Sequence, residues 1–173
     1  MSLALYVSET VGGGGRLYDT TTLSQIVATF GSGVLPSIDL SFQNGTGSGY
    51  ANQWYLARRT LAATTYDLLD LAGGLTQYDG STITFTKIKR VLIALVSPDG
   101  TAKLRIGPQG QSNPFTGPWG GTGATVYREV IHKDDMTHPY AGWTVTAGTG
   151  DILPIYNPTG SSIVYAIWII GES

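Results

Sequence analysis

Residues 37–43 read Ser-Ile-Asp-Leu-Ser-Phe-Gln, and this stretch shows how most of the chain is built. Ile38, Leu40 and Phe42 are apolar and alternate with polar residues. Successive side chains of a β-strand point to opposite faces, so the alternation predicts a strand with one buried face. The next residues, 44–49, form a glycine-rich loop, Asn-Gly-Thr-Gly-Ser-Gly.

Further short segments of the same kind fill the chain beyond this loop. A phase change between Phe85 and Ile88 predicts a bulge, or two strands joined near Lys87. On propensity alone, residues 56–63 are also compatible with a short helix. The strands predicted after the loop span residues 53–60, 65–71, 83–95, 104–106, 124–131, 143–146, 152–156 and 162–170.

Turn residues separate these segments, and no alternation of strands with helices is apparent. Many short strands with Gly and Pro turns are typical of antiparallel sandwiches and barrels. We therefore predict an all-β fold, an antiparallel jelly-roll-like β-sandwich formed by residues 37–173. An immunoglobulin-like sandwich is the alternative.

Residues 1–36 are predicted to form an extended N-terminal arm with glycine hinges. Leu3, Leu5 and Val7 alternate as in a short strand, and four consecutive glycines follow at residues 12–15. Such a strand could add to an exposed sheet edge of another protein.

The second half of the arm has two possible local structures. Thr22 and Gln25 have the spacing of a helical capping box. Leu23 and Ile26 then begin an apolar face at helical spacing, which predicts one or two helical turns before Gly31. An irregular loop held in place by Leu23 and Ile26 is the alternative.

Composition excludes several classes of function. Charged residues make up 13% of the chain, the net charge is −2 and there is no cysteine. No basic field is present to attract nucleic acid, and neither disulfides nor thiolate metal sites are possible. The longest apolar stretch, residues 163–170, is far shorter than the ~20 residues that cross a bilayer. We expect no nucleic-acid or membrane partner.

Catalytic and metal-binding patterns are weak. His132, Asp134, Asp135 and His138 could ligate a metal, but the same run is also typical of a solvated loop. Ser48 lies between two glycines without the following helix that a nucleophile elbow requires. We therefore expect no enzyme activity, no metal and no cofactor.

Three residues are candidates for contacts with other proteins in addition to those of the arm. Trp119 lies in a long loop rich in Gly and Pro, residues 107–123, where an aromatic side chain can anchor a surface contact. Arg58 and Arg59 could pair with an acidic group of a neighbouring subunit. Alternatively, they could discourage incorrect strand pairing at a sheet edge.

Three stretches resemble small β-rich virion proteins of tailed bacteriophages. The first is Arg-Thr-Leu-Ala-Ala at 59–63, leading to Asp-Leu-Leu-Asp-Leu-Ala-Gly at 67–73. The second is Ile-Thr-Phe-Thr-Lys-Ile-Lys at 83–89. The third covers residues 142–153 and runs on to Val-Tyr at 164–165 and Ile-Ile-Gly at 169–171. The family resembled is that of the capsid decoration, or cement, proteins.

This resemblance implies a jelly-roll module that sits on the capsid surface, often as a trimer. We accordingly expect a non-enzymatic virion structural protein that binds and stabilises the shell of major capsid protein. The alternative is a head-fibre or receptor-binding tip that recognises host glycans, with Trp119 as its contact residue.

Overall fold

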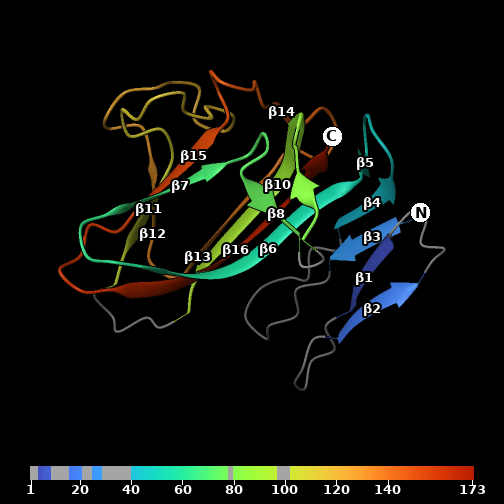
Figure 1. The fold of residues 1–173 in the computed structure, drawn as a ribbon, viewed down its shortest axis with the longest axis horizontal. Helices are drawn as coiled ribbons and strands as arrows, with labels where there is room; N and C mark the ends of the chain where they lie inside the picture. Colours follow the sequence, from blue (N-terminus) through green and yellow to red (C-terminus); the bar gives the residue numbers. More distant parts are fainter. Residues whose placement is uncertain (1–3, 9–15, 21–24, 29–39, 78–79, 97–101) are drawn as a thin grey trace.

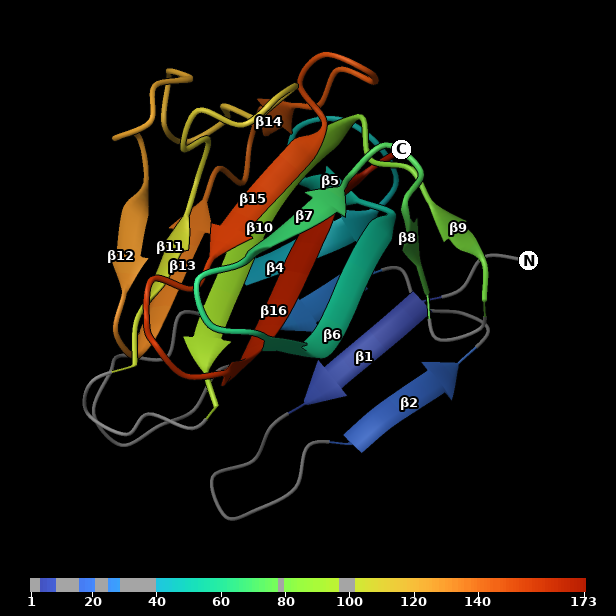
Figure 2. The ribbon, with the colours of Figure 1, turned by 60° about the vertical axis from the view of Figure 1, so that its left-hand side comes forward.

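The computed structural model describes residues 4–8, 16–20, 25–28, 40–77, 80–96 and 102–173. These residues form strands, turns and loops, with no helix among them. The prediction of an all-β fold is therefore confirmed. The strands lie in three layers, seen from two directions in Figures 1 and 2.

The middle layer, here called the central sheet, has the strand order β13-β10-β16-β6, and every neighbouring pair is antiparallel. A short strand, β14 (Trp143–Thr144), also pairs with β10. The four main strands are β6 (Gln53–Leu61), β10 (Lys87–Leu95), β13 (Lys133–Thr137) and β16 (Ile163–Glu172).

The outer sheet packs on one face of the central sheet and has the order β12-β11-β15-β7, again antiparallel throughout. Its strands are β7 (Tyr66–Asp70), β11 (Leu104–Ile106), β12 (Arg128–Val130) and β15 (Ile152–Tyr156). A separate two-stranded sheet pairs β8 (Leu75–Thr76) with β9 (Thr82–Ile83).

The N-terminal sheet lies on the opposite side of the central sheet, with the order β2-β1-β3-β4-β5 (Figure 1). It is mixed, because β1 pairs in parallel with β3 and β4 pairs in parallel with β5. Its strands are β1 (Ala4–Ser8), β2 (Arg16–Thr20), β3 (Gln25–Ala28), β4 (Leu40–Asn44) and β5 (Tyr50–Ala51).

The connectivity of the two main sheets follows from four nested antiparallel pairs. β6 pairs with β16, β7 with β15, β10 with β13, and β11 with β12. Nesting of this kind describes one long ribbon folded back on itself between β11 and β12. Pairing of β10 with β16 and of β11 with β15 then winds the ribbon into two facing sheets. The two facing antiparallel sheets make this part of the chain a β-sandwich.

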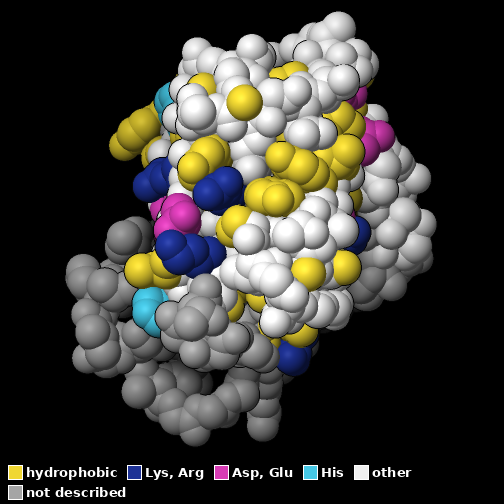
Figure 3. All heavy atoms as spheres, turned by 90° about the vertical axis from the view of Figure 1, so that its left-hand side faces the viewer, with side chains coloured by type: hydrophobic (Ala, Val, Ile, Leu, Met, Phe, Trp, Pro, Cys, Tyr) yellow, Lys and Arg dark blue, Asp and Glu magenta, His cyan; other side chains and the backbone are white. Residues whose placement is uncertain are grey.

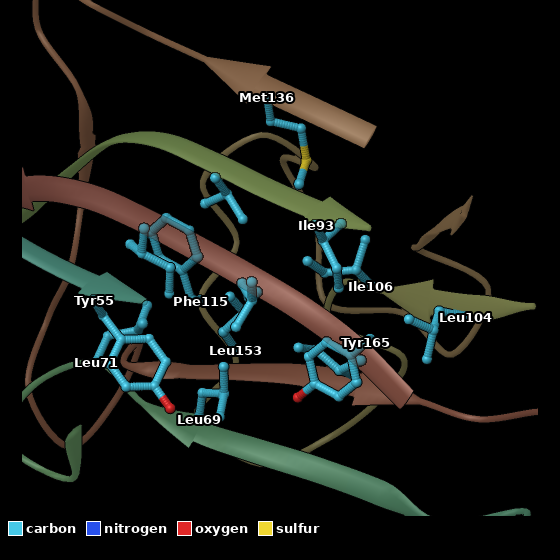
Figure 4. Close-up of a cluster of buried hydrophobic side chains, with 14 of the residues drawn as sticks. Tyr55, Leu69, Leu71, Ile93, Leu104, Ile106, Phe115, Met136, Leu153 and Tyr165 are labelled. Carbon is cyan, nitrogen blue, oxygen red and sulfur yellow. The ribbon is translucent and has the colours of Figure 1, made fainter. Parts of the chain in front are cut away.

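The main hydrophobic core fills the space between the central and outer sheets (Figure 4). Alternation along each strand supplies it: Leu153 and Ile155 of β15 are fully buried, as are Leu104 and Ile106 of β11. Burial of each such side chain stabilises the fold by about 1.5–3 kcal/mol. The central sheet contributes Tyr55, Ile93, Tyr165, Ile167 and Ile169.

The predicted phase change near Lys87 is confirmed. β10 begins at Lys87, separate from β9, and its pairing with β16 shifts register between Ile88 and Arg90. Gly171 lies opposite this irregularity, where the chains approach closely. A Cβ atom there would lie 2.2 Å from the Lys87 carbonyl oxygen and 2.7 Å from the Phe85 ring, so only glycine fits.

Two local expectations are corrected, and one alternative is excluded. Residues 25–28 form strand β3 rather than a helical turn, because pairing with β1 and β4 overrides the local signal, whereas Thr22 and Leu23 lie outside the described residues. The strand predicted over residues 53–60 is confirmed as β6, which excludes the helical alternative for residues 56–61. The region 132–138 is mainly a strand, β13, rather than a loop.

Candidate interaction surface

The arm residues that we expected to contact other proteins belong to strands that are paired within the chain. Leu5 and Val7 lie in β1, and Ile26 lies in β3, whereas Leu3 and Leu23 lie outside the described residues. β1 pairs with β2 on one side and with β3 on the other. This corrects the expectation that the strand with Leu5 and Val7 adds to a sheet edge of another protein, because both edges of β1 are paired within the chain.

Arg59 is used inside the molecule. Its Nε and one terminal nitrogen lie 2.5 and 3.0 Å from the two carboxylate oxygens of Asp67, on the neighbouring edge strand β7. Tyr165 donates its hydroxyl to the same carboxylate at 2.7 Å, and Arg59 also donates to the Tyr55 hydroxyl at 3.0 Å. The hydrogen bond to Asp67 raises the pKa of Arg59, and burial raises the pKa of Tyr165.

This network joins the edges of the two main sheets, since Arg59 and Tyr165 come from the central sheet and Asp67 from the outer sheet. It corrects the expectation that Arg59 pairs with an acidic group of another subunit. Arg58 points to the opposite face of β6 and is exposed, so it stays a candidate contact residue.

Trp119 is partly buried and packs against the main core. Its ring meets that of Phe115 edge-to-face, with 6.3 Å between the ring centres. The loop folds this close because residue 107 is a glycine: a Cβ atom there would lie 2.9 Å from Trp119 Nε1. Much of the side chain expected to anchor a surface contact therefore stabilises the loop instead.

The candidate metal ligands are spread along β13, which holds Asp134 and Asp135 and is flanked by His132 and His138. Asp134 pairs with Arg128 at 2.8 Å, and Asp135 pairs with Arg90 at 2.9 and 2.5 Å. His138 packs edge-to-face on Trp143, with 5.5 Å between ring centres. The described part of the chain holds no group of three or more His, Asp or Glu residues placed to bind a metal.

A buried ion cluster, missed by the sequence reasoning, fixes the glycine-rich loop to the body. The Lys89 ammonium is fully buried and donates to the carbonyl oxygens of Gly47 at 2.9 Å and Tyr140 at 2.8 Å. The Glu172 carboxylate accepts the N–H of Gly47 and lies 2.9 Å from the Lys87 ammonium. The signals visible in the sequence are a lysine and a glutamate within largely apolar segments.

The electrostatics of this cluster favour the charged carboxylate. Burial opposes ionisation of Glu172, but the Gly47 N–H and the ammonium groups of Lys87 and Lys89 together hold its pKa below the ordinary value. Burial lowers the pKa of Lys89, and Glu172 at 3.7 Å opposes that effect. The cluster therefore holds the glycine-rich loop against β16, and its positive and negative charges stabilise one another.

An apolar patch lies on the solvent side of the outer sheet. We call it the β7–β15 patch and define it by Tyr66, Leu68, Ile152, Pro154 and Tyr156. Tyr66 and Leu68 are 39% and 50% exposed, Ile152 and Tyr156 are half-buried, and Pro154 is buried. The rings of Tyr66 and Tyr156 stack, with 4.5 Å between their centres. Figure 3 shows apolar side chains gathered on this side of the molecule, with Lys and Arg side chains beside them.

No protein-family model matches the chain, and no curated protein is significantly similar to it. The resemblance to phage virion proteins therefore stays a prediction. Within the described residues there is also no helix with the length and apolar character needed to cross a membrane.

Proposed function

We propose that this protein is a non-enzymatic structural protein of a bacteriophage virion, a capsid decoration protein that binds and stabilises the shell of major capsid protein. The observation that carries the proposal is the distribution of side chains. Leu56 on the central sheet and Leu68 on the outer sheet are 55% and 50% exposed, in a chain with only 13% charged residues. Exposed apolar side chains on opposite faces of a rigid sandwich favour contacts with other proteins.

The buried charged groups support a structural role. Lys89 pairs with Glu172, Arg90 with Asp135, and the half-exposed Arg59 with Asp67. The first two pairs join segments that are distant in the sequence, and the third joins the edges of the two main sheets. Loss of one partner would leave a charge uncompensated, so these pairs help to hold the strands and loops in place. A protein that withstands the mechanical load of a filled shell needs such contacts between its strands and loops.

The N-terminal sheet gives the body a second contact region. Phe42 and Ala51 are fully buried and pack on Trp168 and Ile170, on the face of the central sheet that points away from the outer sheet. This small core fixes β4 and β5 to the body. Among the described residues β2 is the last strand at the far end of the sheet, and its outer edge is the one that a partner strand would join. Repeated over one shell, weak contacts of this kind give high avidity.

Binding to shells is the test. The full chain, mixed with empty shells of its cognate major capsid protein, should co-sediment with them to a saturating ratio and raise the temperature at which they dissociate. A variant that lacks residues 1–36 should give a β-sheet circular dichroism spectrum yet co-sediment much more weakly.

Failure of the full chain to co-sediment would contradict the proposal. Undiminished binding of the shortened chain would remove the N-terminal arm from it, and would leave the faces of the sandwich as the contact region. Copies of the chain are expected to associate on the shell, with a trimer implied by the resemblance.

A further inference from the structure

β15 is apolar on both of its faces. It reads Ile-Leu-Pro-Ile-Tyr, with Leu153 and Ile155 directed into the core and Ile152, Pro154 and Tyr156 on the opposite face, where Pro154 is buried and the other two are half-buried. In an antiparallel sheet with one solvated face, the outward positions are normally polar. An apolar outward face therefore indicates that something covers it.

The central sheet contains a comparable strand whose outward face is covered. β16 is also apolar on both faces, and its outward residues Trp168 and Ile170 are 7% and 0% exposed. Phe42 and Ala51 of the N-terminal sheet cover them. The outward face of the outer sheet is covered only in part: Pro154 is buried and Ile152 and Tyr156 are half-buried, whereas Tyr66 and Leu68 of the β7–β15 patch remain exposed.

Two charges of opposite sign flank this patch. Arg105 of β11 lies in the same row as Tyr156 and Tyr66, and its guanidinium stacks 4.7 Å above the Tyr127 ring. Its Nε is buried without a hydrogen-bond acceptor in the described part of the chain. Glu129, the neighbour of Arg105 on β12, pairs with Lys103 at 2.9 Å.

The second charge is Asp70, four residues beyond Tyr66 on β7 and on the same face. One of its oxygens accepts the N–H of Ala72 at 2.9 Å, and no ion pair to Asp70 forms among the described residues. Arg105 and Asp70 are separated by two strand spacings of about 4.8 Å and by about 13 Å along the strands, so they cannot pair within one copy.

We propose that the β7–β15 patch binds the same patch of a second copy of this chain. A two-fold axis across the patch exchanges its two ends, so that Arg105 of each copy meets Asp70 of the other while Leu68 and the tyrosines pack between them. An isologous contact requires this kind of self-complementarity. Tyrosine and arginine are also the residues that most often dominate the binding energy of an interface.

The chain's net charge of −2 produces little repulsion between copies. The pairing differs from the threefold association that the resemblance implies. Its role on a shell rests on the proposed function, whereas the contact itself can be tested in solution without shells.

Sedimentation velocity over a range of concentrations tests the contact. The full-length protein should dimerise, with a dissociation constant below about 100 µM if the interface is specific. Leu68→Asp should raise that constant at least about tenfold, because it buries a charge at the centre of the patch. The control is Leu56→Asp, an identical change at a similarly exposed leucine on the central sheet, which should leave dimerisation unchanged.

A second pair of variants tests the charges. Arg105→Glu should weaken dimerisation by about tenfold or more. The new carboxylate at position 105 of each copy would face the Asp70 carboxylate of the other copy, and the two would repel each other. Arg58→Glu makes the same change in net charge at an exposed arginine of β6 and should have no effect. Circular dichroism melting of each variant shows that the fold is retained, and Arg105→Glu keeps the test decisive if Leu68→Asp does not fold.

A monomeric wild type, or an oligomer that tolerates both Leu68→Asp and Arg105→Glu, would overturn the inference. So would a monomeric wild type whose binding to shells is lost on Leu68→Asp, since the patch would then serve the capsid protein. A wild type that dimerises through the patch but ignores shells would uphold this inference and defeat the proposed function instead.

Discussion

Replacement of Asp67 by alanine should destabilise the protein much more than loss of an ordinary surface ion pair. Asp67 accepts hydrogen bonds from Arg59 and from the Tyr165 hydroxyl, and it joins the edges of the two main sheets. Tyr165 is fully buried, so its hydroxyl cannot turn to water when the carboxylate is removed. Arg59 is 37% exposed and can be rehydrated.

The magnitude follows from this difference. A buried hydroxyl left without a partner costs about 1–3 kcal/mol. The pair with the partly exposed Arg59 adds only about 0.2–1 kcal/mol, because solvent screens it. We expect Asp67→Ala to lower the free energy of unfolding by about 2–3 kcal/mol, and the melting temperature by about 4–12 °C for a domain of this size.

Urea unfolding followed by circular dichroism measures the change. Glu129→Ala is the control, because its pair with Lys103 is exposed at both ends and should contribute less than about 1 kcal/mol. The double variant Asp67→Ala/Tyr165→Phe removes both partners and should be more stable than Asp67→Ala alone by about 1 kcal/mol. If the double variant is no more stable than the single one, the orphaned hydroxyl is not the cause and the reasoning fails.

The other two predictions concern the attachment of the N-terminal sheet and its loop. Glu172 has a lowered pKa, so it contributes stability that is present above its ordinary value of 4.5 and is lost as the pH falls through the folded-state pKa. Glu172→Gln should therefore lower the free energy of unfolding at neutral pH and make it fall less steeply as the pH is lowered. Urea unfolding between about pH 3 and 7 measures this dependence, and a decline in acid as steep as that of the wild type would contradict the prediction. Phe42→Ala should cost about 3–5 kcal/mol, because the ring is fully buried between β4 and β16, and thermal melting of the variant beside wild type measures the loss. A cost below about 1 kcal/mol would show that the second core does not hold the N-terminal sheet.

The strands were predictable where burial imposes a two-residue period. β15 and β6 lie within a residue of their predicted bounds, and the irregularity near Lys87 was visible as a slip in that period. Sequence reasoning failed where pairing with a distant strand decides the structure. β3 has a helical spacing of apolar residues but is held extended by β1 and β4, and β13 looks like a polar loop but pairs along β10.

The contact residues were harder to predict than the fold, for a physical reason. Whether Arg59 faces a partner subunit or Asp67 depends on how two edge strands meet, and no local pattern encodes that. Trp119 lies in a loop rich in glycine, yet the loop folds back on the core. The β7–β15 patch could not be predicted from the sequence. The spacing of Tyr66 and Leu68 shows that they share one face of the strand, but not whether that face is buried or exposed.

The long loop between β11 and β12 bears on how tightly this side of the molecule can bind a partner. Its Phe115 is fully buried and donates its N–H to the Ile152 carbonyl at 2.6 Å, beside the β7–β15 patch. Gln109 donates to the carbonyl oxygens of Arg105 and Gly107, each at 3.2 Å, which fixes the start of the loop next to Arg105. A surface held in this way loses little conformational entropy on binding. Even a small interface there can therefore be specific, as the proposed pairing of two copies requires.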